Sequence, residues 1–346
     1  MIITGGGTGG HIFPGIVIAK ALIKNGWDVL WIGTKDRMES FLIPRYNIDI
    51  DFIYINGLRG KGLKFYLLFF FNLFRSLYKL KKIIKIWKPD VILGLGSYIS
   101  APGGIISWIL RIPLIIYEQN VIAGITNKLL AKIANISIQA FPGAILNSIV
   151  VGNPIRNEII SILPPELRFN NRSGPIRILV IGGSQGAKIF NDIFPDVLKL
   201  LKDNILLWHQ VGYNAFNKID AIYKKIGVIQ YRINDFIHNI AKAYAWADLV
   251  VCQSGAITVS ELIAVGLPSI LVPFEHSDHQ QYFNALLLER VGAGIICKQE
   301  KFNVDMFISI FNSLNRSILF KMSVKAKSLY LPGSLERILK IINSCI

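Results

Sequence analysis

Residues 1–14 read MIITGGGTGGHIFP, and residues 176–187 read IRILVIGGSQGA. Each stretch is a short apolar strand that runs into a glycine-rich turn, and a helical pattern follows each turn. Glycine lets a backbone turn sharply and approach a ligand closely, and a helix N-terminus offers free N–H groups and partial positive charge. Because one such turn indicates a phosphate site, two of them predict two nucleotide-binding folds in one chain.

The alternation of apolar strands with helical patterns continues through both halves of the chain. This alternation is typical of βαβ units on a parallel sheet, so we expect an α/β fold with two Rossmann-like, doubly wound domains. Residues 163–175 (LPPELRFNNRSGP) mix Pro, Asn, Gly and charge without an apolar period, which favours a linker. The expected strands are 1–4, 28–32, 91–93, 114–117, 136–139, 149–151, 178–181, 206–210, 228–231, 249–252 and 269–272, and the expected helices are 15–25, 65–87, 105–109, 126–134, 188–201, 237–246, 258–264 and 280–291.

The composition favours an anionic partner. The 346 residues carry a formal net charge of +16, and nine basic residues but no acid lie between Phe52 and Pro89. Nucleic acid, acidic lipid and phosphorylated substrates are the partner classes that such a balance indicates. Three cysteines without disulfide or zinc spacing indicate a reducing cytoplasm, and an N-terminus that opens directly into a strand indicates no signal peptide.

Residues 65–87 predict a helix that is both apolar and basic. The uninterrupted apolar part, 65–74, is too short to span a bilayer, and such a helix fits an interfacial membrane contact. A core helix with a solvated basic face is the alternative, and nucleic acid is supported by charge alone. Residues 91–110 carry no charge, but their Gly, Ser and Pro content favours a strand, loop and helix over a membrane span. The residues expected at the membrane are Phe70, Phe74, Leu77, Lys79, Lys82, Lys85 and Trp87.

The first glycine turn allows a second interpretation. Its G-x-G-x-x-G spacing at 5–10 also matches the dinucleotide fingerprint of NAD enzymes, for which Asp28 or Asp36 would supply the ribose-binding acid. The turn adds Thr8 and His11, which that fingerprint does not need. His11 lies at the predicted loop–helix junction, as either a capping and packing residue or a functional imidazole.

The second glycine turn, 182–186, matches the G-x-S-x-G nucleophile elbow of hydrolases. A hydrolase also needs an acid and then a histidine later in the chain, and the available residues have no distinctive context. These residues are Asp248, Asp278, His209, His276 and His279. We therefore interpret Ser184 as a loop hydroxyl beside a phosphate.

Residues 249–261 (LVVCQSGAITVSE) predict a buried strand, a Ser-Gly turn and a helix start whose N–H groups could hold a diphosphate. Glu261 could accept hydrogen bonds from two ribose hydroxyls. Thr258 and Glu261 also match a capping box, and both interpretations can hold together.

Two patterns resemble metal sites only superficially. His276 and His279 are spaced for one helical turn, but no third ligand is evident. The pair Asp49 and Asp51 resembles the D-x-D of metal-dependent sugar transferases, and we interpret it as an exposed strand face. We expect no metal.

Together these stretches resemble the MurG family of bacterial peripheral membrane glycosyltransferases, in glycosyltransferase family 28. The matching stretches follow the order of the family along nearly the whole chain. They are GGGTGGHIFPG (5–15), GLRGKG (57–62), SYISAPGG (97–104), EQNVIAGITN (118–127), QAFPGA (139–144), VGNPIR (151–156), GGSQGA (182–187), AYAWADLVVC (243–252), SGAITVSE (254–261) and PFEHSDHQQYFNA (273–285).

The resemblance implies the GT-B architecture, two Rossmann-like domains with the active site in the cleft between them. Residues 1–157 with a C-terminal helix at 332–346 would form the domain on the acceptor and membrane side, and 158–331 would bind the UDP-sugar. The implied reaction is inverting transfer of N-acetylglucosamine from UDP-N-acetylglucosamine to the 4-hydroxyl of undecaprenyl-pyrophosphoryl-MurNAc-pentapeptide. This reaction serves peptidoglycan synthesis, and through it cell-wall biogenesis, cell shape and cell division.

The resemblance also implies a setting. The protein would lie peripherally on the cytoplasmic face of the inner membrane, beside other cell-wall synthesis proteins, with no cofactor and no nucleic acid. A GT-B transferase with another lipid or small acceptor is the alternative. An NAD oxidoreductase and a membrane-binding adaptor with an inactive nucleotide fold remain further alternatives.

Site residues are carried over only where this sequence matches the family motifs. The implied UDP-sugar contacts are Thr8, Gly9, Gly10, Asn120, Arg156, Ser184, Ile237, Ala256, Ile257, Thr258, Val259, Ser260, Glu261 and Gln281. His11 is our candidate for the base that takes the proton of the acceptor hydroxyl. Gln253 departs from the family, which usually has Arg there, so one cation near the diphosphate is missing.

Overall fold

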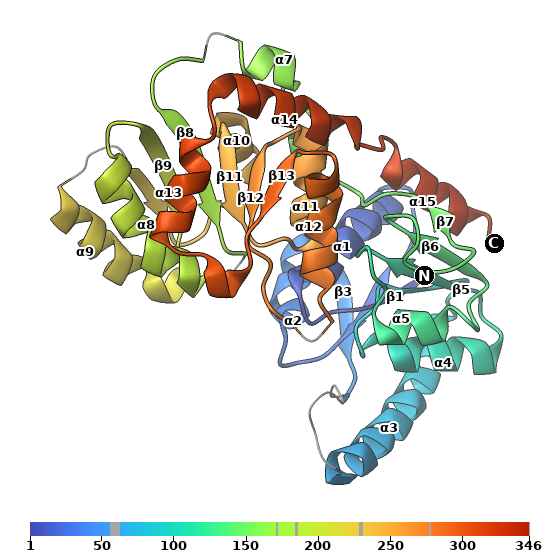
Figure 1. Cartoon of the computed structure of the whole chain (residues 1–346). Helices are drawn as coiled ribbons and strands as arrows, with labels where there is room; N and C mark the ends of the chain where they lie inside the picture. The colour runs from blue at the N-terminus through green and yellow to red at the C-terminus, as the bar shows by residue number, and fades with distance from the viewer. Residues whose placement is uncertain (56–62, 171, 184–185, 228–230, 277, 346) are drawn as a thin grey trace. The chain divides into compact units, whose positions relative to one another are not determined.

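A computed structural model describes residues 1–55, 63–170, 172–183, 186–227, 231–276 and 278–345, with the backbone alone at 63–67 (Figure 1). The chain divides into two compact units. The first is Met1–Pro154 with Leu331–Ile346, and the second is Ile155–Tyr330. The bounds drawn from the resemblance, 1–157 with 332–346 and 158–331, differ from these by a few residues. The stretch 57–62 and Ser184 lie outside the described residues.

In the described part of the first unit, seven parallel strands form a sheet in the order β3-β2-β1-β4-β5-β6-β7. The chain starts at β1, moves out to β3 and then returns to β4, so the strand order reverses between β1 and β4. The elements are β1 Ile2–Thr4, α1 Gly9–Lys24, β2 Leu30–Gly33, α2 Met38–Leu42, η1 Pro44–Tyr46, β3 Asp49–Phe52, α3 Leu63–Trp87, β4 Ile92–Gly94, α4 Ser100–Leu110, β5 Leu114–Glu118, α5 Ile125–Leu130, β6 Ile136–Gln139, β7 Ile149–Val150 and α15 Ser334–Asn343.

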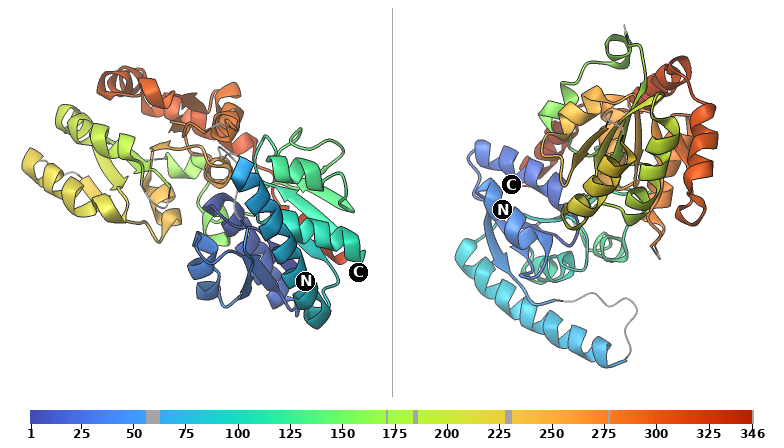
Figure 2. Two further views of the ribbon diagram at one scale, coloured as in Figure 1. Left: turned by 90° about the horizontal axis from the view of Figure 1, so that it is seen from below. Right: turned by 90° about the vertical axis from the view of Figure 1, so that its left-hand side faces the viewer.

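Helices cover both faces of this sheet because its strands are apolar on both sides. One core packs α1 and α15 against strand residues such as Ile3 and Leu93. The other core packs α3 and α4 against residues such as Ile2 and Ile92. Figure 2 shows α3 and α4 side by side. Thus the end of the chain, through Ile338 and Ile342 of α15, completes the first core.

In the described part of the second unit, six parallel strands follow the order β10-β9-β8-β11-β12-β13, with the reversal between β8 and β11. Two Rossmann-like parallel sheets confirm the predicted fold class. The elements are α6 Asn157–Ile160, α7 Pro165–Arg168, β8 Ile176–Ile181, α8 Lys188–Leu201, β9 Ile205–Gln210, η2 Tyr213–Ala215, α9 Phe216–Ile226, β10 Tyr231–Asn234, α10 Ile240–Trp246, β11 Leu249–Cys252, α11 Ala256–Val265, β12 Ser269–Leu271, α12 Gln280–Arg290, β13 Gly294–Ile296, η3 Gln299–Lys301, α13 Val304–Asn312 and α14 Arg316–Ser328.

The core of the second unit packs α8, α9, α13 and α14 against alternate residues of the central strands, such as Val180 and Val251. Phe194 and Phe307 meet edge to face at 5.2 Å between ring centroids in this core. The predicted linker 163–175 is held to this unit, because the buried Arg168 donates to Val265 O at 2.9 Å. Arg172 likewise binds Asp248.

The first helix differs from the prediction in a way that bears on the site. It begins at Gly9 rather than at residue 15, with Thr8 in the extended conformation before it. Glycine and proline are poor residues for a helix interior, so local propensity disfavours a helix across residues 9–14. Pro14 is nevertheless accommodated within the helix, so the glycine turn itself supplies the helix N-terminus.

Candidate functional site

The glycine turn of the first unit leaves β1 and enters α1. No side chain caps this helix, and the first N–H groups of a helix have no partner within it. Among the described residues, no acceptor binds the N–H groups of Thr8, Gly9 or Gly10. These three residues, which the resemblance implies contact the UDP-sugar, therefore offer N–H groups to an anion.

His11 lies in the first turn of α1 and faces the loop after β4. Its Nδ1 is 3.2 Å from Thr8 Oγ1. A side-chain carbon on Gly96 would lie 3.1 Å from His11 Nε2 and 3.0 Å from Asn127 Nδ2. The imidazole thus lies at the reversal between β1 and β4, where doubly wound sheets bind their ligands.

The charge state of His11 suits a proton acceptor. Burial lowers the pKa of His11, and the carboxylates of Glu118 and Glu39 act in the opposite direction. The imidazole is therefore mostly neutral at neutral pH, which leaves a ring nitrogen able to accept a proton.

Glu118, at the end of β5, organises the loop that carries Asn120. Its buried carboxylate accepts hydrogen bonds from Asn120 N at 2.9 Å, Asn120 Nδ2 at 3.0 Å and Gly124 N at 3.1 Å. It also accepts one from Asn127 Nδ2 at 2.9 Å. Reasoning from the residues alone missed Asn120 and Glu118, because the hydrogen bonds become visible only in the folded loop.

In the second unit, α11 begins at Ala256 directly after Gly255. The expected contacts Ala256, Ile257, Thr258, Val259, Ser260 and Glu261 form the first part of this helix. The capping-box interpretation is wrong, because Gly255 occupies the N-cap position and Thr258 lies inside the first turn. No described residue accepts a hydrogen bond from the N–H groups of Ala256, Ile257 or Thr258, so these groups can bind an anion.

Glu261 is held by two partners inside the second unit. Its Oε1 lies 3.0 Å from Arg156 Nη2, and its Oε2 accepts a hydrogen bond from the Tyr244 hydroxyl at 3.0 Å. Burial raises the pKa of Glu261, and Arg156 acts in the opposite direction. The structure thus brings Arg156 and Glu261 together, as the resemblance would require of two residues that share a ligand.

Gln281 joins the loops that follow two neighbouring strands, β11 and β12. Its Oε1 accepts hydrogen bonds from Ser254 N at 3.2 Å and Phe274 N at 2.9 Å. Ile237 is buried just before α10. Gln253 lies at the second glycine turn, since a side-chain carbon on Gly183 would be 4.0 Å from Gln253 Oε1. Gln253 and Gln281 therefore lie at the carboxyl ends of β8, β11 and β12, and Ile237 follows the carboxyl end of β10.

The expected membrane residues on α3 do not share one environment. Phe70 and Phe74 are 53% and 69% exposed, and Lys82 and Lys85 are also exposed. Leu77 and Trp87 instead pack against the core, and Lys79 binds Asp51 at 2.7 Å. The apolar side chains of α3 lie on more than one face of the helix, so some of them pack against the core and others face solvent.

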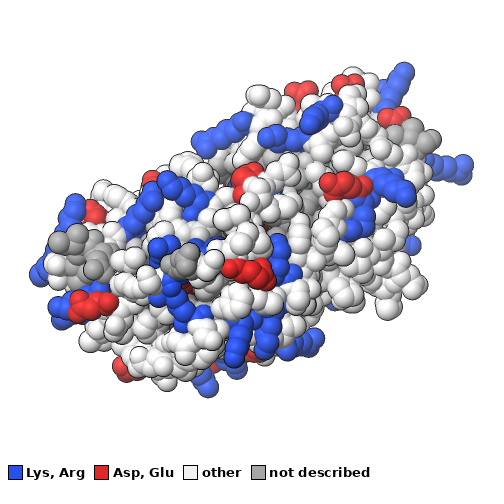
Figure 3. All heavy atoms as spheres, turned by 90° about the horizontal axis from the view of Figure 1, so that it is seen from above, with Lys and Arg blue, Asp and Glu red and all other residues white. Residues whose placement is uncertain are grey.

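Basic side chains are not confined to α3. On the face drawn in Figure 3, Lys and Arg side chains are spread over the surface, with fewer Asp and Glu between them. None of the helices formed by the described residues is long and apolar enough to cross a membrane.

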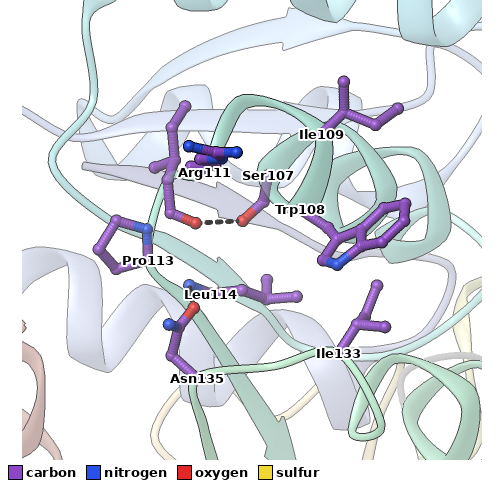
Figure 4. A pocket seen from close by; sticks show the side chains of 9 residues that line it. Ser107, Trp108, Ile109, Arg111, Pro113, Leu114, Ile133 and Asn135 are labelled. Carbon is purple, nitrogen blue, oxygen red and sulfur yellow. Dashed lines mark hydrogen bonds between the residues drawn. The ribbon is translucent and has the colours of Figure 1, made fainter.

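A cavity of about 650 Å³ lies at the amino end of β5 (Figure 4). Trp108, Arg111, Leu114 and Ile133 are among the residues that line it. The ligand crevice of a doubly wound sheet lies at the carboxyl ends of its strands, where Glu118 ends β5. The cavity is therefore separate from the candidate site.

The described residues form neither the acid–histidine pair of a hydrolase nor a metal site. His209 is fully buried and its Nδ1 lies 2.8 Å from the Tyr223 hydroxyl, while Asp248 is paired with Arg172 and Arg316. No group of three His, Cys, Asp or Glu is placed to hold a metal within the described part of the chain. Asp51, from the D-x-D pattern, is paired with Lys79.

Comparisons with known proteins cover nearly the whole chain. The family described as glycosyltransferase family 28 N-terminal domain matches residues 1–138, and its C-terminal domain matches residues 177–334. A protein of Buchnera aphidicola subsp. Schizaphis graminum is 52% identical over 99% of this chain and 97% of its own. One of Erwinia tasmaniensis is 48% identical over 98% of this chain and 96% of its own. Both are named UDP-N-acetylglucosamine–N-acetylmuramyl-(pentapeptide) pyrophosphoryl-undecaprenol N-acetylglucosamine transferase.

Solved structures agree with the sequence comparison. The crystal structure of Acinetobacter baumannii MurG superimposes with a TM-score of 0.85 at 32% identity, over 99% of both chains. The calicheamicin glycosyltransferase reaches a TM-score of 0.73 at 12% identity, over 99% of this chain and 97% of its own, which shows the shared fold alone.

Proposed function

The chain belongs to glycosyltransferase family 28, and on that premise we propose that it transfers N-acetylglucosamine from UDP-N-acetylglucosamine to the lipid-linked N-acetylmuramyl-pentapeptide of peptidoglycan synthesis. The observation that carries this function is 52% identity over 99% of the chain to a relative that bears the name of this activity. The protein is an enzyme of the hexosyltransferase class.

We place the acceptor on the first unit, with His11 as the base. The acceptor 4-hydroxyl oxygen bonds to the anomeric carbon as the bond from that carbon to UDP breaks, which inverts the configuration. With Nδ1 engaged by Thr8 Oγ1, Nε2 takes the hydroxyl proton. The lowered pKa of His11 supports this role, because a neutral ring is ready to accept a proton.

We place the donor on the second unit. The free N–H groups at the start of α11 and the Arg156 guanidinium would stabilise the charge that develops on departing UDP. Glu261, held by Arg156 and Tyr244, still has lone pairs for ribose hydroxyls. Gln253 supplies no positive charge where the family usually has Arg, so Arg156 provides a larger share of the stabilisation of the diphosphate charge. No step requires a metal.

We further propose that α3 brings the first unit to the anionic cytoplasmic leaflet that holds the acceptor. The support is that α3 exposes both aromatic side chains, Phe70 and Phe74, and, further along the same helix, the cations Lys82 and Lys85. Aromatic rings suit the membrane interface, and each basic residue near an anionic leaflet contributes about 1 kcal/mol.

The activity is tested with labelled UDP-N-acetylglucosamine and a lipid-linked muramyl-pentapeptide. Labelled lipid product is expected, and NAD is expected not to bind. Binding of the UDP-sugar without transfer would point to a transferase with another acceptor. Binding of NAD would support an oxidoreductase, and binding of neither nucleotide would support a membrane adaptor.

The membrane contact is tested by sedimentation with anionic vesicles. The double variant Lys82→Glu, Lys85→Glu is expected to bind roughly tenfold or more weakly, since each reversal replaces attraction with repulsion. The matched control is Lys298→Glu, Lys321→Glu, which changes net charge equally at exposed positions of the second unit. Equal loss in both doubles would show that net charge, rather than α3, governs binding.

A further inference from the structure

The carboxylate of Glu39 lies directly beneath the first glycine turn. Glu39 comes from the short helix α2 and is fully buried. It accepts hydrogen bonds from Gly7 N at 2.9 Å, Thr34 N at 3.0 Å and Thr34 Oγ1 at 2.7 Å. No Lys or Arg of the described residues pairs with it. Since a buried carboxylate is costly unless it is hydrogen-bonded, these three donors are what keep Glu39 in place.

The surrounding backbone is shaped to admit this carboxylate. A side-chain carbon on Gly6 would lie 2.6 Å from both carboxylate oxygens, and one on Gly33 would lie 2.6 Å from Glu39 Cγ. Gly7 adopts a φ of +87°, a conformation that glycine reaches without strain. The glycines at positions 6 and 33 therefore leave the space that the Glu39 side chain occupies.

The contact also divides the N–H groups of the turn into two sets. The Gly7 N–H is committed to Glu39, whereas those of Thr8, Gly9 and Gly10 have no acceptor among the described residues. The other end of the turn is fixed as well, because Trp31 Nε1 donates to Gly5 O at 2.9 Å. The start of α1 follows directly from this fixed turn, and His11 lies within its first four residues.

We propose that Glu39 is a positioning residue for sugar transfer, which sets the start of α1 through the Gly7 N–H and thereby places His11 against the acceptor hydroxyl. The proposal rests on the proposed function, because it assigns a role within that reaction.

Glu39 also acts on His11 through its charge. The charged groups that face the imidazole are Glu118 and Glu39, and both raise its pKa against the effect of burial. Removing the negative charge of Glu39 therefore lowers the pKa of His11 further. A residue with a merely structural role would not move the pH dependence of the reaction.

The test is the variant Glu39→Gln, assayed for acceptor kinetics across pH. In this variant the side-chain amide oxygen of residue 39 can still accept the two hydrogen bonds from Thr34. Its NH₂ group then faces the Gly7 N–H, and since both are donors, the Gly7 N–H loses its acceptor. We expect kcat/KM for the acceptor to fall roughly tenfold to a hundredfold, because small misplacements of catalytic groups have effects of this size. The acid limb of the pH profile is expected to move to lower pH.

Two companion variants separate charge from geometry. Thr34→Val keeps the charge of Glu39 but removes one donor, so we expect a smaller fall in kcat/KM with no shift of the pH profile. Glu300→Gln, an exposed carboxyl of the second unit, is the control and is expected to match the wild type.

Each outcome decides the proposal. A folded Glu39→Gln variant with wild-type kcat/KM and an unshifted pH profile would overturn it. If circular dichroism shows that this variant does not fold, Thr34→Val decides: reduced acceptor kcat/KM supports the proposal, and unchanged kcat/KM overturns it. An inactive wild type would instead refute the proposed function, which keeps the two failures distinct.

Discussion

At the scale of single residues, the buried acids of the site act by holding other groups in place. The role of Glu261 as a hydrogen-bond acceptor was an expectation from the sequence. Its partners were not predictable, because Arg156 and Tyr244 lie 105 and 17 residues away along the chain. Glu39 and Glu118 gave no signal of their own, since their roles depend on backbone N–H groups that only the fold brings to them.

The orientation of Glu261 yields a prediction for donor binding. Tyr244→Phe removes the hydroxyl that donates to Glu261 Oε2. Because a hydrogen bond of this kind contributes about 1 kcal/mol, KM for the UDP-sugar should rise roughly fivefold, with kcat nearly unchanged. Donor titration at saturating acceptor measures this, with Tyr46→Phe on the first unit as the control. An unchanged donor KM would show that Glu261 needs no orientation by Tyr244.

His209 predicts how stability depends on pH. Burial lowers its pKa to about 3, and its Nε2 has no partner among the described residues. Well above pH 6.5, the ordinary pKa of histidine, the ring is neutral in both the folded and the unfolded chain, so it has no effect there. As pH falls from there towards 3, only the unfolded chain takes up the proton, and the free energy of unfolding decreases.

The variant His209→Asn removes this titration. Urea unfolding between pH 7 and 4 should therefore show a weaker loss of stability for the variant than for the wild type, whatever their difference at pH 7. If the free energy of unfolding fell equally with pH in the variant and the wild type, His209 would not be neutral in the folded protein.

At the scale of elements, α3 and α1 show what periodicity can and cannot reveal. The helical period placed α3 correctly to its last residue, Trp87. Periodicity could not separate the face that packs on the sheet from the face in solvent, because both are apolar. The start of α1 was missed since local propensity treats glycine and proline as breakers, whereas the fold uses the glycine turn as the helix N-terminus.

The two faces of α3 should respond differently to mutation. Leu80 is buried, so Leu80→Ala should lower the free energy of unfolding by about 2–5 kcal/mol. Phe74→Ser should leave stability within about 0.5 kcal/mol, because Phe74 is 69% exposed, yet weaken vesicle binding. Chemical denaturation and vesicle sedimentation measure the pair. Vesicle binding by Phe74→Ser equal to that of the wild type would exclude this face as the membrane contact.

At the scale of the whole molecule, the repeated glycine turns were enough to predict two Rossmann-like folds. The topology that followed from βαβ alternation is present in both units, with the site residues at the carboxyl ends of the strands. The return of α15 to the first core could not be read from periodicity, because its packing partner α1 lies at the other end of the chain.

The assignment of UDP binding to the second unit predicts where UDP slows the hydrogen exchange of backbone amides. Addition of UDP should slow hydrogen exchange within the second unit, Ile155–Tyr330, most strongly at the start of α11. A ligand that binds only the folded state stabilises the part that it contacts. Protection on the first unit alone, with none at the start of α11, would contradict the assignment of the UDP portion to the second unit.

The most direct test of the account is single-turnover transfer by His11→Ala, with donor affinity measured on the same protein. The account predicts that UDP-N-acetylglucosamine binds with unchanged affinity while the rate of transfer falls about 10²–10⁴-fold, the contribution of a general base. Near-normal turnover by His11→Ala would contradict it and leave His11 with a structural role at the start of α1.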